Sequence, residues 1–448
     1  LAACGTSADG SANPGFARPA VRDQDAGCRW KTDAAGLPSK RSSQVCRNVV
    51  RTEGNALEES GMKIVVLGNQ AKSMRNFWSV LIAHMRRAGH EVLCCVPPGD
   101  AASEAALTAL GAQVRTYPLD RKGLNPLSDI RTLGALVRLF KEEKPDLLFA
   151  STIKPVIYGC MAARVARVPH IYATITGLGY AFEADSFFKK AVNKLSCLLY
   201  RTALSGAEGV FFQNQDDIRV FRQAGILGPR ARVLTARGTG VDTARFAPAP
   251  FPDLTETGEL AGPPVFLLVA RLLEAKGLPE YAEAARLLKA RYPAARFQVL
   301  GPPEHGLGSV SLDQINAWEA RGSIEYLGET SDVRPYVAAA HVLVLPSWRE
   351  GTPTSIMEGM SMGRPAVVTD APGCREVVRQ GVNGLLTPLR DAQALADAME
   401  TFITTPQNIL RMGAAGRELA LRELDAHTVA ARILEDMRVP AVHKDSQA

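Results

Sequence analysis

Two glutamates, Glu350 and Glu358, enclose a run of small residues from Gly351 to Ser355. The run follows an apolar segment typical of a buried strand and begins a helical pattern, in which Pro353 suits the first turn because it lacks an N–H. Backbone N–H groups at a helix start can bind a phosphate, and the carboxylates can accept hydrogen bonds from sugar hydroxyls. One turn thus offers groups for both halves of a nucleotide sugar. The alternative is an ordinary helix start, with Thr352 as its cap and Glu358 on a solvated face.

Arg271 and Lys276 form a second candidate group, at the end of another predicted strand, 265–270. Two fixed cations at this place could hold a diphosphate and offset its charge as a glycosidic bond breaks. A basic pair at a strand end is by itself more often ordinary surface. The functional interpretation of the pair therefore depends on the glutamates, which follow a strand of the same predicted sheet.

The elements that must position these residues alternate between apolar runs of strand length and longer helical patterns, and the alternation restarts after residues 246–264. Repeated strand–helix units predict an α/β protein with two doubly wound, Rossmann-like domains facing a cleft. Ligands of such sheets bind beyond the carboxyl ends of the strands. The predicted strands are 64–68, 91–96, 113–116, 146–150, 169–173, 208–213, 231–235, 265–270, 296–300, 323–327, 342–346 and 366–369. The predicted helices include 76–88, 127–143, 187–204, 277–291, 311–320, 332–339, 353–361, 391–403 and 406–422.

The segment 1–61 differs from the rest of the chain. It is rich in Gly, Ser, Ala and Arg and has almost no apolar periodicity. We expect it to be disordered or a mis-annotated extension, with Met62 as the natural start. The organisation that we expect after it is one domain over 62–245, a second over 246–424, and a C-terminal helix and tail over 425–448.

Composition limits the classes of function. Residues 62–242 carry 24 Lys and Arg against 14 Asp and Glu, whereas 243–448 carry 20 against 25. The first half would therefore meet something anionic, such as a lipid surface or a diphosphate, unless the excess is only solvated surface. An aromatic content of 6% without a recognisable RNA module argues against nucleic acid. Eight cysteines without CxxC spacing indicate buried, reduced thiols, and no apolar run reaches the roughly 18–20 residues of a membrane span.

With these residues the chain resembles the retaining glycosyltransferases of the large group 1 family (family 4), which have the GT-B fold. The resemblance covers Met62 to Asp436 and rests on Arg271, Lys276, the Glu350–Glu358 segment and further motifs downstream. Those motifs are Gly363–Pro365, Thr369–Asp370, Pro372–Glu376 and Gly381–Gly384. The resemblance implies that 62–245 binds the acceptor and that 246–424 binds a nucleotide-sugar donor.

The resemblance also implies a role for each donor-side residue. Arg271 and Lys276 would contact the donor diphosphate, and Glu350 would contact the sugar hydroxyls. Glu358 would contact the ribose hydroxyls, and the segment around Leu327 would border the base. The residues that would line the sugar phosphate are Gly351, Thr352, Pro353, Thr354 and Ser355. Reaction would be by front-side attack, with a donor phosphate oxygen accepting the proton, so that no protein base, metal or other cofactor is expected.

Three first-half segments resemble a narrower group, namely Ser151–Pro155, Thr176–Phe182 and Gly238–Asp242. They are similar to bacterial enzymes that add galactose or N-acetylgalactosamine to a polyprenyl-diphosphate-linked sugar such as bacillosamine. Many relatives carry a histidine after the fourth strand and a double glycine in the first loop, and this chain has neither. Lys154 could instead pair with an acceptor phosphate, or simply face solvent. The first loop offers Ser73, Arg75 and Asn76 for acceptor binding.

We therefore expect a retaining hexosyltransferase that uses a nucleotide sugar, UDP-linked, and a lipid-linked or other glycan acceptor in cell-surface polysaccharide or glycoprotein glycan assembly. One alternative keeps the fold but makes the protein a nucleotide-sugar epimerase or a phosphorylase, whose expected histidine or pyridoxal phosphate lysine is not visible. Another is a basic membrane-binding protein with a degenerate site, against which the intact Arg271, Lys276, Glu350 and Glu358 argue.

The segment Asp185–Leu204 combines apolar side chains with lysines and an arginine. This pattern suits either contact with an anionic membrane or packing of a helix on its sheet. The expected location is the cytoplasm, with peripheral contact at the inner face of the cytoplasmic membrane left open.

Overall fold

The computed structural model of the protein describes residues 61–121, 125–177, 187–228, 231–306 and 308–440, without the side chains of 187–191. All of these fall within one compact unit, Leu57–Ala448. The expectation for the N-terminal segment concerns residues outside this set. So does the part of the Thr176–Phe182 motif after Gly177.

A seven-stranded parallel sheet occupies the first half, in the order β3-β2-β1-β4-β5-β6-β7. Strand β1, in the interior of this sheet, contributes to two cores, because Ile64 and Val66 face one cluster while Val65 and Leu67 face the other. Runs that are apolar at every position are typical of strands buried on both faces, so the strand predictions are confirmed here within two residues. The bounds are β1 Lys63–Leu67, β2 Glu91–Val96, β3 Gln113–Thr116, β4 Leu147–Ser151, β5 His170–Ile175, β6 Gly209–Phe212 and β7 Val233–Thr235.

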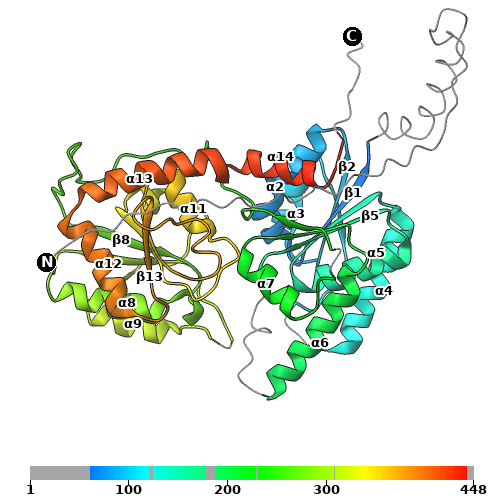
Figure 1. The fold of residues 1–448 in the computed structure, drawn as a ribbon, viewed down its shortest axis with the longest axis horizontal. Coiled ribbons are helices and arrows are strands. Elements are labelled where there is room, and N and C mark those ends of the chain that lie inside the picture. The colour runs from blue at the N-terminus through cyan, green and yellow to red at the C-terminus, as the bar shows by residue number, and fades with distance from the viewer. Residues whose placement is uncertain (1–60, 122–124, 178–186, 229–230, 307, 441–448) are drawn as a thin grey trace, which may run out of the picture. The chain divides into compact units, whose positions relative to one another are not determined.

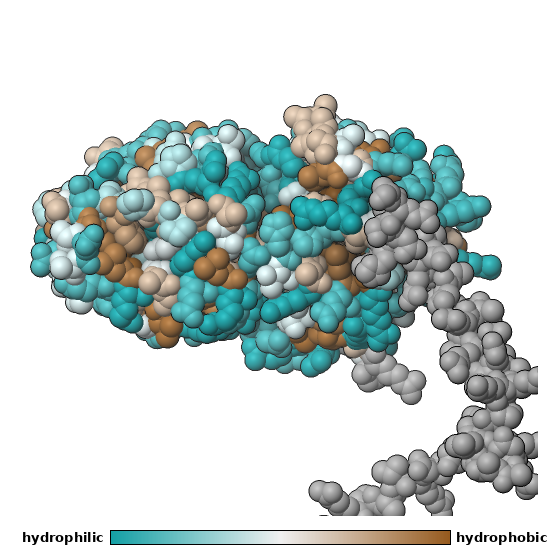
Figure 2. All heavy atoms as spheres, turned by 90° about the horizontal axis from the view of Figure 1, so that it is seen from above, coloured by the Kyte–Doolittle hydropathy of each residue, from teal (hydrophilic) through white to brown (hydrophobic). Residues whose placement is uncertain are grey.

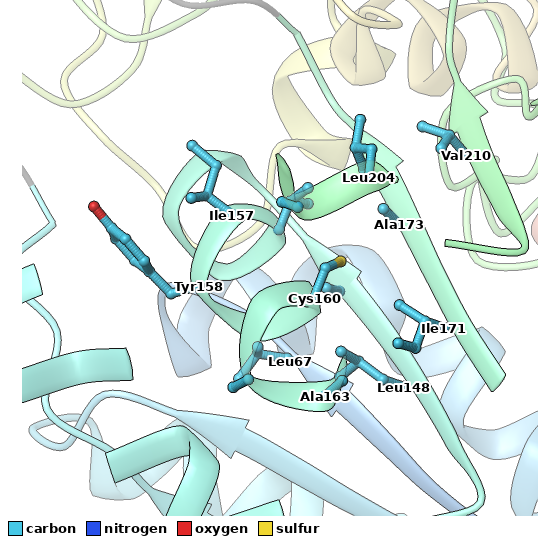
Figure 3. Packing of buried hydrophobic residues seen from close by; sticks show 14 of the residues in the cluster. Leu67, Leu148, Ile157, Tyr158, Cys160, Ala163, Ile171, Ala173, Leu204 and Val210 are labelled. Carbon is cyan, nitrogen blue, oxygen red and sulfur yellow. The ribbon is translucent and has the colours of Figure 1, made fainter. Parts of the chain in front are cut away.

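Helices cover both faces of this sheet (Figure 1). One face packs against α4, α5, α6 and α7, and the other against α2, α3 and α14. Their bounds are α2 Ala71–Arg87, α3 Ala101–Ala109, α4 Pro126–Glu143, α5 Cys160–Ala166, α6 Phe187–Leu204, α7 Gln215–Gln223 and α14 Ala426–Asp436. In the first of these cores Cys160 lies among side chains from neighbouring strands, including Leu148 and Ile171 (Figure 3). The predicted burial of thiols is confirmed for Cys160, Cys94, Cys95 and Cys374, whereas Cys197 is only partly buried.

A second parallel sheet, of six strands, has the order β10-β9-β8-β11-β12-β13. The bounds are β8 Val265–Val269, β9 Arg296–Leu300, β10 Glu325–Tyr326, β11 Val342–Leu345, β12 Ala366–Thr369 and β13 Gly384–Thr387. The helices are α8 Leu278–Lys289, α9 Leu312–Ala320, α10 Arg334–Ala338, α11 Thr354–Ser361, α12 Ala392–Thr404 and α13 Gln407–Leu419. β13 was not predicted; it is four residues long and pairs with β12 at the edge of the sheet.

The C-terminal helix α14 returns to the first sheet. Asp425 caps it by accepting hydrogen bonds from the backbone N–H groups of His427 and Thr428. Ile433 on this helix and Met437 directly after it join the core that α2 forms with the first sheet. The face that carries α13 and α14 is a mosaic of hydrophilic side chains with small, separate apolar patches (Figure 2). Among the described residues, no helix has the length and apolar content that crossing a membrane requires.

Candidate functional site

Two of the three predicted catalytic residues, Lys276 and Glu350, meet because the strands before them are neighbours. β11 pairs with β8 in parallel register, so the loops that follow both strands leave the same edge of the sheet. Lys276 comes from the loop after β8, and Glu350 from the loop after β11. The Lys276 Nζ and Glu350 Oε1 atoms are 2.5 Å apart, and both side chains are mostly buried. The structure thus places a cation and a carboxylate together at the carboxyl edge of the second sheet, where the donor is predicted to bind. This edge is called the donor edge below.

The loop that carries Lys276 is held against the end of β11. Gly277 has φ +75°, and a Cβ at this position would overlap the carbonyl of Pro346. The Ala275 carbonyl accepts hydrogen bonds from the Ser347 hydroxyl at 3.0 Å and from the Trp348 N–H at 2.9 Å. Only a glycine allows this approach of the two loops, which fixes the position of Lys276.

Arg271 lies apart from this pair. Its guanidinium donates to Glu304, with 2.7 Å between Arg271 Nη1 and Glu304 Oε2, and its side chain is 57% exposed. Glu304 belongs to the loop after β9, the strand on the other side of β8, and the sequence analysis did not single it out. The two predicted cations therefore have different partners, Glu350 for Lys276 and Glu304 for Arg271.

The run of small residues leads into α11, but its start differs from the expectation. The helix begins at Thr354, and Pro353 is its N-cap residue with extended backbone rather than a first-turn residue. Thr352 does not cap the helix either: its Oγ1 is buried without a hydrogen-bond partner. A Cβ at Gly238 would lie 3.0 Å from the Thr352 Cβ, so the motif that begins at Gly238 borders this loop. With no side-chain cap, the first turn of α11 keeps N–H groups for another acceptor.

Glu358 lies one turn into α11 and is half-buried, so the alternative of a fully solvated position is wrong. Burial raises the pKa of its carboxyl to about 7. The positive charge of Arg245 lowers this pKa and the negative charge of Asp332 raises it, both less than burial does. A carboxyl that titrates near neutrality next to an uncapped helix start is suited to hydrogen bonding with a polar ligand.

Leu327 follows β10 and is partly buried against the core below the donor edge. Its N–H donates to the Val299 carbonyl at 2.8 Å, which continues the β9–β10 pairing by one residue. β10 and β11 lie on opposite sides of the β9–β8 pair. The predicted base-binding residue is therefore at the same sheet edge as Lys276 and Glu350, two strands away from β8.

The loop 346–353 between β11 and α11 is called the donor loop below. A first-half residue that the sequence analysis missed, Asn214, contacts it directly. Asn214 Nδ2 lies 3.3 Å from each of the carbonyl oxygens of Glu350 and Gly351. A Cβ on Gly351 would overlap the Thr176 carbonyl and the Gln213 side chain, which end β5 and β6. The signal in the sequence was an asparagine directly after a strand, with Asp217 three residues later, which is typical of a helix N-cap.

The predicted acceptor lysine is neither solvent-facing nor isolated. Lys154 Nζ lies 2.7 Å from Asp129 Oδ1 on α4, and the lysine side chain is 15% exposed. The solvent-facing alternative is therefore wrong, and an acceptor phosphate would have to compete with the Asp129 carboxylate. The hydroxyl of Tyr158 also hydrogen-bonds Asp129, and burial raises its pKa.

The other acceptor candidates lie on α2 and not in the first loop, because the helix starts at Ala71 rather than at the predicted residue 76. Ala71 and Met74 are buried, and this packing starts the helix earlier than its sequence pattern indicated. Ser73 Oγ hydrogen-bonds the Gln70 side chain at 3.2 Å, and Arg75 Nε donates to Asn76 Oδ1 at 3.1 Å.

Thr152 is a strained residue beside these candidates. Its φ is +71°, a rare conformation for a β-branched residue, and its Oγ1 is buried without a partner. It directly follows β4, whose neighbour β1 leads into α2. The loop after β4 therefore brings Thr152 and Lys154 to the carboxyl edge of the first sheet.

Comparison with known proteins agrees with this architecture. Residues 263–405 match the family described as "Glycosyl transferases group 1", and 74–237 match "Glycosyl transferase 4-like domain". The crystal structure of Anabaena HepE in complex with UDP and glucose superimposes with a TM-score of 0.66 at 20% identity, covering 84% of this chain and 99% of that one.

Two bacterial relatives span most of the chain. The N,N'-diacetylbacillosaminyl-diphospho-undecaprenol alpha-1,3-N-acetylgalactosaminyltransferase of Campylobacter jejuni is 25% identical over 84% of this chain and 98% of the relative. The putative glycosyltransferase EpsD of Bacillus subtilis is 33% identical over 70% of this chain and 82% of the relative. The chain therefore belongs to the group 1 glycosyltransferases and has their GT-B fold of two Rossmann-like domains.

Proposed function

We propose that this glycosyltransferase moves a sugar from a UDP-sugar to a polyprenyl-diphosphate-linked sugar, with retention of configuration, in the assembly of a cell-surface glycan. The observation that carries the proposal is the 2.5 Å contact between Lys276 and Glu350 beside the uncapped start of α11. A nucleotide sugar needs cations and N–H groups for its diphosphate and hydrogen-bond acceptors for its hydroxyls, and this edge offers all of them.

Each donor-side residue has a chemical role in this proposal. Lys276, together with the first-turn N–H groups of α11, stabilises the charge that grows on the leaving diphosphate. Arg271 adds a second cation from the rim of the site, and Glu350 orients the sugar through its hydroxyls. Glu358 accepts hydrogen bonds from the ribose. UDP as the nucleotide is supported by HepE, whose structure was solved with UDP and glucose.

The acceptor assignment is supported by the Campylobacter relative, whose name specifies a diphospho-undecaprenol-linked sugar as its acceptor. On this chain Lys154 is the residue that we assign to the acceptor phosphate. Ser73, Arg75 and Asn76 lie on α2, which follows β1, the strand that pairs with β4. A donor phosphate oxygen takes the acceptor proton, so that no protein base is required.

A direct test presents the purified protein with membrane lipid-linked acceptors and a panel of UDP- and GDP-sugars, and follows incorporation of the sugar. Transfer from a UDP-sugar with an α-linked product from an α-linked donor supports the proposal. An inverted product refutes retention, and release of nucleotide without any acceptor favours an epimerase-like reaction. Because no metal is expected, transfer should continue in excess chelator; loss of transfer that manganese restores would contradict this.

Contact with the membrane is part of the same proposal. The described part of α6 buries Tyr200 and Leu204 against the sheet, yet Leu195 and Leu198 are 57% and 60% exposed. Lys194 is exposed beside them, so a basic and apolar surface is available to an anionic bilayer.

Co-sedimentation with phosphatidylglycerol vesicles tests this surface. Substitution of Leu195 and Leu198 by Glu should lower the bound fraction several-fold, because the apolar contact is lost and negative charge is added. The matched control is Leu312→Glu, since Leu312 is a 46% exposed leucine on α9 in the second half. Equal binding by both variants would remove α6 from the membrane contact.

A further inference from the structure

The N-terminal turn of α7 is built so that one side chain serves two elements. Asn214 is the N-cap of α7, and its Oδ1 accepts a hydrogen bond from the Asp217 N–H at 2.8 Å. Because the oxygen is committed to the cap, the amide nitrogen must point the other way. There it meets the carbonyl oxygens of Glu350 and Gly351, at 3.3 Å each, in a position that is 1% exposed.

Close packing against the first half fixes the position of the donor loop. Gly351 lies so close to the Thr176 carbonyl and the Gln213 side chain that no side chain fits between them. Glu350 carries both a carbonyl that Asn214 holds and the carboxylate that contacts Lys276. A shift of this backbone therefore moves the carboxylate and the start of α11 together.

Charges on either side strengthen the same junction. The buried Asp217 forms an ion pair with Arg349, the residue before Glu350. Its neighbour Asp216 lies 2.8 Å from Arg375, which also pairs with Asp370 at 2.6 Å. Three residues near the start of α7, namely Asn214, Asp216 and Asp217, thus contact loops that follow strands β11 and β12.

We propose that Asn214 is a positioning residue for the donor site: its amide fixes the Glu350–Gly351 backbone from the first half, so that the Glu350 carboxylate and the α11 N–H groups face the donor. This inference rests on the proposed function, because the donor site is where the effect would be felt. It assigns a donor-side role to a residue of the half that was expected to serve the acceptor.

Two substitutions separate this role from helix capping. Asn214→Ser keeps an oxygen that can cap α7 but removes the amide nitrogen that reaches the donor loop, whereas Asn214→Ala removes both. The control Ser311→Ala removes the cap of α9, where Ser311 Oγ accepts from the Gln314 N–H, without touching the donor loop. Tm, kcat and the separate KM values for donor and acceptor are measured for each variant.

We expect Asn214→Ser to keep nearly the wild-type Tm. Its kcat should fall and its donor KM rise, so that kcat/KM for the donor falls roughly tenfold, with acceptor KM unchanged. Asn214→Ala should lose the same activity and also Tm, and Ser311→Ala should lose only Tm. Recovery of both Tm and wild-type kinetics in Asn214→Ser would overturn the inference, because capping alone would then explain the residue. Absence of any transfer by the wild-type protein would instead overturn the proposed function.

Discussion

The carboxyl edges of the two sheets both present a lysine paired with a carboxylate, but the pairs are built differently. At the second sheet, Lys276 and Glu350 come from two short loops that follow adjacent strands and bind each other's backbone. At the first sheet, Lys154 follows β4, while its partner Asp129 lies on α4. In the first case both partners are proposed ligands of the donor, whereas in the second the Asp129 carboxylate would compete with the proposed acceptor phosphate for Lys154. Substitutions should therefore reduce sugar transfer most at the second sheet and less at the first.

The largest effect is expected for Glu350→Ala. The variant loses the contact with the sugar hydroxyls and leaves Lys276 without its carboxylate, so kcat/KM for transfer should fall by about 10² to 10³. Glu283→Ala is the matched control, because Glu283 forms only an exposed ion pair with Arg286 on α8. Transfer rates of the two variants are compared with the same donor and acceptor, and an unchanged rate for Glu350→Ala would refute the donor assignment.

Lys276→Met should lower kcat by about 100-fold, since it removes a mostly buried cation from the leaving diphosphate. Arg271→Met should cost less, roughly tenfold, because Arg271 is more exposed and is already paired with Glu304. Steady-state kinetics of both variants with the nucleotide sugar give the comparison. A larger loss for Arg271→Met would mean that the diphosphate lies on the Glu304 side of the site.

A smaller and more selective effect is expected at the first sheet. Lys154→Met should raise acceptor KM by roughly tenfold, because the acceptor phosphate loses its cation. Donor KM should stay unchanged, because the substitution does not alter Lys276 or Glu350 at the second sheet. Asp129→Asn removes the competing carboxylate and should lower acceptor KM. If Lys154→Met changed the donor KM instead, the two edges would not divide donor from acceptor in the way proposed.

The last prediction concerns stability rather than activity, and its dependence on pH. Burial raises the pKa of Glu358 from its ordinary value of 4.5 to about 7 in the folded protein, so folding favours the protonated form. The stabilisation is present below the unfolded pKa and is lost as the pH rises through the folded value, at no more than about 1.4 kcal/mol per pH unit. Urea unfolding between pH 4.5 and 7 should therefore show a decline that Glu358→Gln lacks. The same slope in both proteins would show that Glu358 titrates normally.

The position of Lys276 and Glu350 at one edge of the second sheet could be predicted because the signals for it are local in the sequence. Glu350 and Glu358 lie on one continuous segment, and the strands before Arg271 and Glu350 are unbroken apolar runs. The start of α11 was misplaced by one residue, because a proline suits both the N-cap position and the first turn. β13 was missed because Gly384–Thr387 is a four-residue edge strand with only two large apolar residues.

Contacts between segments far apart in the sequence could not be predicted in this way. Asn214 and Glu350 are 136 positions apart, and no periodicity within α7 indicates what its cap will touch. The pairing of Lys154 with Asp129 depends on how α4 packs beside the turn after β4. Thr152, with its strained backbone and buried Oγ1, has an ordinary sequence context. These features arise from tertiary packing, which a local pattern does not encode.

The return of α14 to the first sheet has a consequence for how the protein is made. The apolar side of α2, including Ile82 and Met85, is synthesised roughly 350 residues before Ile433, which covers the same core. At typical translation rates this interval lasts tens of seconds, roughly 20 to 70 s. Part of the apolar surface of the nascent first half therefore stays exposed during this interval. Ribosome-bound chains that end before Ala426 should be more prone to aggregation and chaperone binding than chains that include α14.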